Sequence, residues 1–290
     1  MDKKQKKTKS EYTGMVPAVD QASRILLSLA KSPSLKVNLT DICKSVGIHK
    51  SKGYTILNTL QKYGLVQKDL AGKTYSLGLG LISLSRRVLD NLNYGDVADP
   101  ILKILAEKTH STALFGIING GNVFVVAKQE AEQLISVTIR LGYRFNITHG
   151  AHGKAIVAFL PKEERKRILN QNKLFFHGDR SKLNRNRLNI ELERCRASGF
   201  AFDMGQLHAG LNVIASPVFD SQERLIGSMF IMGTFPESLI QQYGPWVAES
   251  AKEFSSMLGA DVKQILKRLA KENDKDGWAE QSDRTCQNLV

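Results

Sequence analysis

The chain has 290 residues, of which 42% are hydrophobic, and it carries a formal net charge of +13. This length exceeds what one compact domain usually contains, so we expect two domains, each with its own core. Cys43, Cys195 and Cys286 are too few and too far apart for a disulfide framework or a cysteine zinc site. The sequence shows no secretory leader and no apolar stretch of about 18 residues, so we expect a cytoplasmic protein.

The positive charge is concentrated in the first third of the chain. Residues 1–95 contain 16 Lys and Arg against 6 Asp and Glu, a net charge of +10, whereas the remainder contains 25 against 22. A compact basic region suits a polyanion, and duplex DNA is the usual one. Charge alone is equally compatible with a basic protein that binds no nucleic acid.

Three helices are predicted near the N-terminus. Apolar residues at helical spacing indicate a first helix that ends before Pro33, a second at Asp41–Val46 and a third at about Lys50–Tyr63. Gly47 lies where a tight turn between two helices requires positive φ. Thr40 is either the N-cap of the second helix or a residue of its first turn.

Two short strand patterns follow the third helix. They are Leu65–Asp69 and Thr74–Leu77, and the four residues between them include Gly72, which favours a hairpin. Three helices with a glycine turn, followed by a hairpin, make the outline of a winged helix-turn-helix. A helical segment at Leu79–Leu92 leads out of this region, either as an element that transmits a conformational change or as a passive linker.

The rest of the chain mixes helices with strands that hairpins connect. Asn119-Gly120-Gly121 is a strong hairpin signal. The predicted helices are Pro100–Lys108, Ala151–Leu160, Lys162–Asn170, Arg187–Ser198 and Pro236–Leu269. The predicted strands are Thr112–Ile118, Asn122–Ala127, Leu134–Arg140, Phe200–Asp203, Val213–Phe219 and Leu225–Met232. This order favours an α+β domain with an antiparallel sheet over a doubly wound fold.

These elements predict five regions along the chain. We expect a disordered basic arm at 1–14, a winged helix-turn-helix domain at 15–78, a linker helix at 79–95, an effector-binding domain at 96–272 and a flexible tail at 273–290.

The start of the third helix carries the candidate DNA contacts. A recognition helix inserts its N-terminal residues into the major groove, where short polar and basic side chains reach phosphates and base edges. Each lysine taken singly is more often a solvated surface residue, but here the basic residues coincide with the helix start and the wing tip. The candidates are Lys50, Ser51, Lys52, Tyr54, Thr55 and Lys73.

Two residues of this helix have alternative interpretations. Ser51 either donates a hydrogen bond to a DNA phosphate or stabilises the start of the helix. Gly53 costs about 1 kcal/mol relative to Ala in a helix interior. It either permits close approach to the DNA backbone or marks a weakly formed helix.

These residues resemble the IclR family of regulators. The head carries VPAVDQASRILLSLA, LTDICKSVGIHKSKGYTILNTLQKYGLVQKD and GKTYSLG, and the body carries THGAHGKAIVAFLP and GFAFDMGQLHAGLNVIASPVFDSQERLIGSMFIMG. The resemblance covers Val16 to Leu269. It implies a winged head that binds pseudo-palindromic operators and a GAF-like effector domain that holds a small organic acid. It also implies homodimers or homotetramers, no catalysis, and action as a repressor or an activator.

The resemblance also implies where an effector binds. The family's ligand pocket lies among the start of the HGKA helix, the acidic segment after the GF strand and the last two core strands. The matching positions here are Ala151, His152, Asp203, Val213, Phe230 and Met232. In family members that hold small hydrophilic acids, the last three positions tend to be Cys and Ser. The head departs from the family as well, because Thr55 stands where Arg is common and Gly53 replaces a β-branched residue or Ala.

Large apolar side chains at these three positions indicate a partly apolar ligand, such as an aromatic acid. They suit a ring or a short aliphatic chain and cannot by themselves satisfy a buried carboxylate. The start of the helix at Ala151 offers backbone N–H groups for an acidic end, with His149 and His152 beside it. The alternative is that Val213, Phe230 and Met232 are core residues with no ligand nearby.

Some of these residues are also compatible with a metal site or with another function. His149, His152, Asp203 and His208 contain ligand types that zinc accepts, but no HxxxH or HExxH spacing supports a metal site, and we expect no cofactor.

A general base built from His152 or His208 with Asp203 would make the protein a hydrolase or another small-molecule enzyme. No nucleophile elbow, P-loop or dinucleotide motif supports an enzyme. A DNA-binding protein without ligand sensing is the third possibility.

Overall fold

The chain divides into two compact units, Met1–Asn91 and Leu92–Val290, which we call the head and the effector unit. The computed structural model describes residues 15–275 apart from 70, 72, 93, 133–135 and 179–182. The predicted basic arm at 1–14 lies outside the described residues, as does the predicted tail beyond Lys275.

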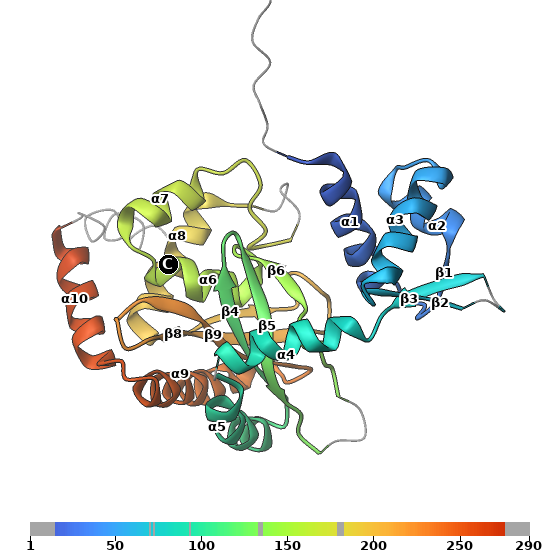
Figure 1. Ribbon diagram of the computed structural model, residues 1–290. Coiled ribbons are helices and arrows are strands. Elements are labelled where there is room, and N and C mark those ends of the chain that lie inside the picture. Colours follow the sequence, from blue (N-terminus) through green and yellow to red (C-terminus); the bar gives the residue numbers. More distant parts are fainter. Residues whose placement is uncertain are drawn as a thin grey trace, which may run out of the picture. The chain divides into compact units, whose positions relative to one another are not determined.

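The head is a helical domain with a small sheet (Figure 1). Its described elements are α1 (Pro17–Lys31), β1 (Val37–Asn38), α2 (Leu39–Val46), α3 (Lys50–Lys62), β2 (Val66–Asp69), β3 (Thr74–Leu77) and α4 (Gly80–Leu92). The strands pair antiparallel in the order β1-β3-β2. The three predicted helices and the hairpin after them are therefore confirmed, as is the helix that follows the wing.

Local signals explain the turn between α2 and α3. Asn38 is the N-cap of α2, and its side chain accepts the backbone N–H of Asp41 at 2.9 Å. Thr40 is thus a residue of the first turn. Gly47 ends α2 with φ of +72°, a conformation that favours glycine. The three helices close over a core that includes Ile25, Ile42 and Leu57.

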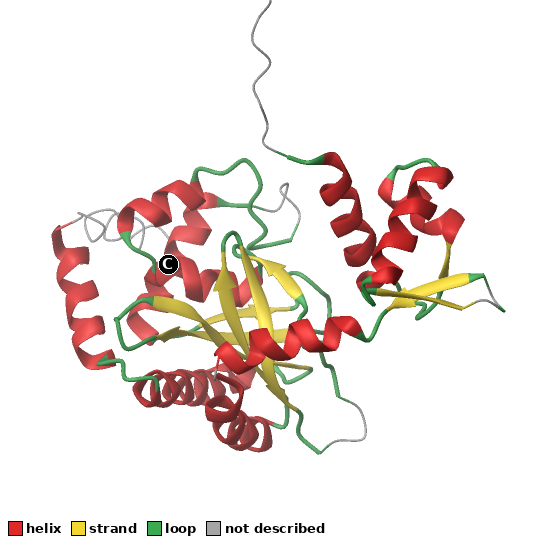
Figure 2. Cartoon of the chain, viewed as in Figure 1, coloured by secondary structure: helices red, strands yellow, loops and turns green. Residues whose placement is uncertain are grey.

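The effector unit is built on a six-stranded antiparallel sheet (Figure 2). Its elements are α5 (Tyr94–Thr109), β4 (Thr112–Asn119), β5 (Asn122–Gln129), β6 (Arg144–Asn146), α6 (Gly150–Phe159), α7 (Lys162–Leu169), α8 (Arg185–Ser198), β7 (Ala201–Met204), β8 (Asn212–Phe219), β9 (Leu225–Gly233), η2 (Glu237–Leu239), α9 (Ile240–Met257) and α10 (Val262–Lys275). The strand order is β6-β5-β4-β9-β8-β7, and the α+β fold class is confirmed.

Helices cover both faces of this sheet and create two cores. One core lies between the sheet and α6 and α8, and it includes Ala155, Leu192 and Phe230. The other lies between the sheet and α5 and α9, and it includes Leu102 and Phe254. The candidate effector residues belong to the first core or border it, so their surroundings are formed by α6 and α8.

The predicted strand at Leu134–Arg140 is wrong for residues 136–140, the part that the structure describes. Val137 and Ile139 pack against the core with alternating exposed neighbours, which explains the strand-like pattern. The segment is tied to the sheet by Thr112, whose Oγ1 donates to the Val137 carbonyl at 2.6 Å. The edge strand is instead β6, which follows a turn at Gly142 with φ of +78°.

The last predicted helix is also divided. A single helix was expected at Pro236–Leu269, but η2 and α9 end at Met257 and α10 begins at Val262. Gly259 between them has φ of +89°, which breaks the helix, although an isolated glycine does not reveal this from sequence. α10 continues to Lys275, beyond the start of the predicted tail at residue 273.

The helix predicted to begin at Pro100 begins at Tyr94. Pro100 lies inside α5, so the proline does not mark its first turn. The first turn contains Asp96 instead.

Candidate functional site

The first turn of α3 presents polar and basic residues to solvent. Lys50, Ser51 and Lys52 are all exposed. His49 is the N-cap of the helix: its Nδ1 accepts the backbone N–H of Ser51 and lies 2.9 Å from the Ser51 hydroxyl. Ser51 therefore serves the start of the helix, one of the two roles considered for it, while the lysines remain free to contact a polyanion.

The exposed side of α3 continues with Tyr54 and Thr55. The Tyr54 ring is 45% exposed, and the Lys68 ammonium from β2 lies 5.4 Å from its centroid. Thr55 Oγ1 donates to the Ser51 carbonyl at 3.1 Å, a bond within the helix that water or DNA can replace. Lys73 is exposed at the wing, with φ of +51°. The candidate DNA residues thus lie on α3 and the wing of one unit.

Gly53 faces the protein interior and not the solvent. A Cβ at this position would lie 2.3 Å from Cys43 Sγ on α2. Real side chains do not approach so closely, so glycine allows α2 and α3 to pack together. Neither sequence interpretation of Gly53 anticipated this role.

The candidate effector residues form a row across the sheet. Asp203 on β7 pairs with Val213 on β8, and Val213 pairs with Met232 on β9. Residues directly opposite in an antiparallel sheet share one face. Phe230 is two residues from Met232 and lies on the same face, which α6 covers. The structure therefore brings together the residues that the resemblance assigned.

The start of α6 lies directly over the Asp203 end of this row. Gly150, the first residue of α6, has φ of +52°, and a Cβ there would lie 3.4 Å from Asp203 Oδ2 and 2.6 Å from Leu207 Cδ1. Ala151 and His152 follow and are buried. A ligand carboxylate at this helix start would consequently face the Asp203 carboxylate, a conflict that the sequence did not reveal.

Aromatic rings surround His152. Its ring centroid lies 4.6 Å from that of Phe145, 5.6 Å from that of Phe230 and 5.4 Å from that of His149. Sequence reasoning missed Phe145 because it lies on β6, a strand that was not predicted. The one sequence feature that could have indicated Phe145 was its position four residues before His149.

Burial controls the charge of this site. It lowers the pKa of His152 to about 3, with a smaller contribution from His149, and lowers that of His149 to about 4. Burial raises the pKa of Asp203, although the N–H groups of Gln206 and Leu207 and the charge of Lys154 oppose the shift. Both histidines are therefore neutral near pH 7.

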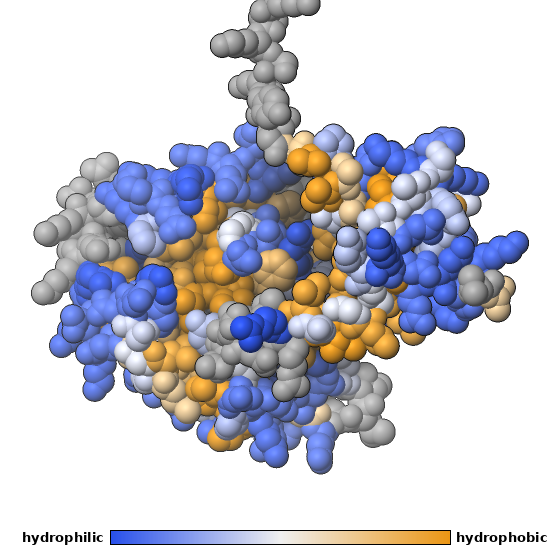
Figure 3. Space-filling view, viewed as in Figure 1, coloured by the Kyte–Doolittle hydropathy of each residue, from blue (hydrophilic) through white to orange (hydrophobic). Residues whose placement is uncertain are grey.

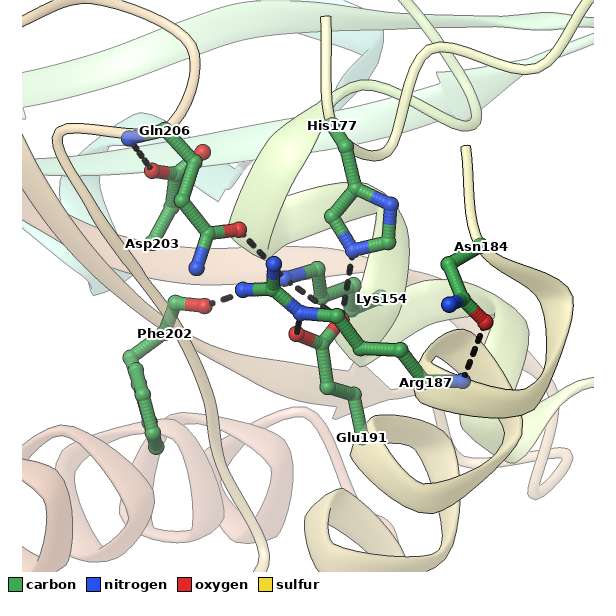
Figure 4. Close-up of polar contacts among 8 residues, drawn as sticks. All are labelled: Lys154, His177, Asn184, Arg187, Glu191, Phe202, Asp203 and Gln206. Atoms are coloured by element: carbon green, nitrogen blue, oxygen red, sulfur yellow. Dashed lines mark hydrogen bonds and ion pairs between the residues drawn. The ribbon is translucent and has the colours of Figure 1, made fainter. Parts of the chain in front are cut away.

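A buried ion pair holds the surrounding elements together (Figure 4). Lys154 of α6 has a side chain that is only 1% exposed, and its Nζ lies 2.8 Å from Glu191 Oε2 on α8. It also donates to the Phe202 carbonyl on β7 at 3.4 Å. His177 and Arg187 bind the same carboxylate at 2.8 and 2.9 Å.

The partners of Glu191 determine its ionisation. Burial alone would raise the pKa of Glu191, but the His177 hydrogen bond and the Lys154 charge outweigh it and lower the pKa to about 2. α6, α8 and β7 are thus joined by charged groups next to Asp203. Sequence reasoning did not identify Lys154 or Glu191, although Lys154 belongs to the HGKA stretch.

The enzyme and metal hypotheses gain no geometric support. With a pKa of about 3, His152 is a weak general base at neutral pH. Among the residues that the structure describes, no three His, Cys, Asp or Glu side chains lie close enough to hold a metal ion. Within the same described ranges, no helix combines the length and apolarity needed to cross a bilayer.

A winged helix-turn-helix head joined to an antiparallel-sheet unit defines a class of protein, the DNA-binding regulators with a separate sensory domain. Comparison with known families agrees. The model of the bacterial transcriptional regulator IclR C-terminal domain matches residues 86–258, and that of the IclR helix-turn-helix domain matches residues 18–70. The chain belongs to the IclR family of transcriptional regulators.

Individual relatives show the same arrangement. The HTH-type transcriptional regulator XynR of Escherichia coli is 26% identical over 215 residues, covering 74% of this chain and 85% of that protein. KipR of Bacillus subtilis is 24% identical, covering 83% and 95%. The crystal structure of IclR from Thermotoga maritima is 28% identical, with a TM-score of 0.65, covering 83% and 98%. XynR and KipR are both named as transcriptional regulators.

Proposed function

We propose that this regulator changes its affinity for operator DNA when its effector unit binds a small, partly apolar organic acid. The observation that carries the proposal is the row of Asp203, Val213 and Met232 beneath the start of α6. An apolar floor with a few buried polar groups is typical of small-molecule sites. The effector-binding residues are Ala151, His152, Asp203, Val213, Phe230 and Met232, to which we add Phe145.

Contact with DNA is assigned to α3 and the wing. Lys50, Lys52 and Lys73 neutralise phosphates, and Tyr54 and Thr55 add polar contacts to the backbone or base edges. Ser51 contributes through the helix start that it stabilises together with His49. The exposed and basic character of this surface supports the assignment.

Apolar residues on the head support self-association as a dimer or tetramer. Figure 3 shows hydrophobic surface at the start of α1 and on α4. Val16 and Val19 are 60% and 62% exposed, and on α4 Ile82 and Leu84 are 62% and 57% exposed. A dimer would cover such residues and would place two recognition helices on the two halves of a palindromic operator.

The apolar floor predicts the ligand preference. Phe230 is 1% exposed and Met232 is 4% exposed, and both belong to the apolar core between the sheet and α6. A ring or short chain gains favourable contact there, whereas a small hydrophilic acid does not.

Calorimetry with the intact protein tests the preference. Benzoate-type acids should bind at least ten-fold more tightly than pyruvate-type acids, and Phe230→Ser should reduce the difference. Tighter binding of the small hydrophilic acids would reject the proposed ligand class. If no acid binds and none alters DNA affinity, the chain is a DNA-binding protein without ligand sensing.

A further inference from the structure

A groove crosses the surface of the head where α1 and α2 pack against each other (Figure 1). Its volume is about 520 Å³, which is within the range of pockets that hold ligands or partner side chains. The α1 wall includes Arg24, Leu27 and Lys31, and the α2 wall includes Asp41 and Ser45. No residue that lines the groove is among those assigned above to DNA, to the effector or to self-association.

The α1 wall carries two cationic side chains on one side of the helix. Arg24 and Lys31 are seven residues apart, so their Cα atoms are separated by two turns, about 10 Å. Both side chains are exposed. Arg24 is 3.8 Å from Asp20, and an exposed pair at this distance contributes little. Lys31 has no ion pair among the contacts described. Leu27 lies between the two cations and is 46% exposed.

The polar groups on the facing wall already have partners. The hydroxyls of Ser28 and Ser45 join α1 to α2 with a hydrogen bond of 2.8 Å. The Asp41 carboxylate accepts the side-chain N–H of Asn38 at 2.8 Å. The groove therefore offers a ligand two cations and the apolar surface between them, which is complementary to an anion with an apolar part.

We propose that this groove binds an acidic amphipathic helix of another protein. Two acidic residues seven positions apart in such a helix have the same spacing as Arg24 and Lys31. An apolar residue three or four positions after the first acidic residue lies between them and packs on Leu27. Helices bind to grooves through anchors with this spacing.

The groove suits a protein helix better than a DNA backbone. A phosphate backbone is negative along its whole length and would face the Asp41 carboxylate, whereas a helix can present a neutral or basic residue there. The residues that we assign to DNA lie on α3 and the wing. The groove thus adds a third partner, a protein that the head can bind through residues other than those assigned to DNA.

Labelled peptides test this proposal with the intact protein by fluorescence polarisation. The probe is an alanine-rich helical peptide with two Glu residues seven positions apart and Leu between them. A second peptide has the same composition, with its two Glu residues on opposite sides of the helix. The first peptide should bind at least ten-fold more tightly than the second, because only the first places both carboxylates on the groove.

Variants connect the peptide to the groove. Arg24→Gln and Lys31→Gln should each weaken binding of the first peptide at least three-fold, and the double variant at least ten-fold. Replacing the peptide Leu by Ser should weaken binding to the parent protein but not to Leu27→Ser. Lys44→Gln is the control, since Lys44 is an exposed cation of α2 that does not line the groove. Circular dichroism would confirm that each variant is folded.

Three results would overturn the proposal. The first is no binding of the first peptide up to about 1 mM. The second is equal binding of the two peptides, or an equal loss with Lys44→Gln, because either would show that charge alone attracts them. The third is a smaller salt slope for duplex DNA in the Arg24 and Lys31 double variant, which would make the groove a DNA contact. None of these results affects the proposed effector response, since the effector residues and α3 are unchanged.

Discussion

Gly53 shows how one residue sets the geometry of the recognition helix. Its missing side chain leaves the space that Cys43 Sγ occupies, so α2 and α3 pack more closely than any other residue would permit. The helix-propensity cost of glycine is therefore offset by helix packing. The orientation of α3, and of the lysines at its start, depends on this contact.

Replacing Gly53 by Ala should destabilise the head. The gain in helix propensity is about 1 kcal/mol, but overpacking costs about 1–3 kcal/mol, so a net loss of about 1 kcal/mol is expected. Urea unfolding of the protein would measure it. Cys43→Ala in the same chain should recover much of the loss. Gly95→Ala is the control, since a Cβ there meets no atom within 4 Å. A Gly53→Ala variant as stable as the parent would contradict the packing role.

The histidines of the effector site predict a pH dependence. The pKa of His152 is about 3 in the folded protein and near 6.5 when unfolded, so the unfolded state binds more protons between these values. Stability should fall as the pH decreases through this window, by about 2 kcal/mol between pH 6.5 and 5. His149, with a pKa of about 4, acts in the same direction. Glu191 adds a further loss only below pH 4.5.

Urea unfolding at several pH values measures this effect. His152→Phe should flatten the decrease between pH 6.5 and 5, while His208→Gln, at an exposed residue, should change it little. An unchanged slope in His152→Phe would show that His152 titrates normally.

At the scale of elements, the ion pair of Lys154 and Glu191 joins α6 to α8. The two residues are not equivalent. Glu191 also binds His177 and Arg187. Among the contacts described, the only carboxylate that Lys154 binds is that of Glu191, and its other acceptors are neutral. Glu191→Gln leaves a buried ammonium with neutral acceptors. Lys154→Met leaves a carboxylate that retains two partners.

Glu191→Gln should therefore be the more harmful change. We expect a loss of about 3 kcal/mol for Glu191→Gln and a smaller loss for Lys154→Met, by urea unfolding. Glu130→Gln breaks a comparable pair with Lys128, but on the surface, and should cost less than about 1 kcal/mol. Equal losses for Glu191→Gln and Lys154→Met would contradict this account of the partners.

The DNA-binding surface makes a prediction at the same scale. Lys50→Gln, Lys52→Gln and Lys73→Gln should each weaken binding to all DNA sequences and reduce the slope of log affinity against log salt by about 1. Fluorescence anisotropy with duplex DNA over a salt series would show this. Lys252→Gln on α9 removes an exposed charge from the effector unit and should leave the slope unchanged. If all three head variants keep the salt slope of the parent protein, DNA binds to a different surface.

The sequence predicted those elements whose signals are local. Gly47, the Asn119-Gly120-Gly121 turn and the apolar periodicity located the helix-turn-helix and the hairpin of β4 and β5. β6 was missed because its three residues depend on pairing with β5, and the break at Gly259 looked like an isolated helical glycine. Phe145, Lys154 and Glu191 were missed because only the folded chain brings β6, α6 and α8 together.

At the scale of the whole molecule, we propose different partners for the two units. The head is basic and presents α3 and the wing, whereas the small-molecule site that we propose lies in the effector unit, on β7, β8, β9 and α6. Regulation requires that effector binding and DNA binding change each other's free energy, and this coupling is reciprocal. A ligand that binds the two conformational states equally would change nothing.

The most direct measurement is DNA affinity with and without the acid. Fluorescence anisotropy would follow the intact protein binding to its own upstream DNA, over a salt series and with benzoate-type and pyruvate-type acids. We predict specific binding that weakens with salt and a five-fold or larger change in affinity with a benzoate-type acid. Specific DNA binding that no acid alters would contradict the ligand-responsive function and leave a DNA-binding protein without sensing.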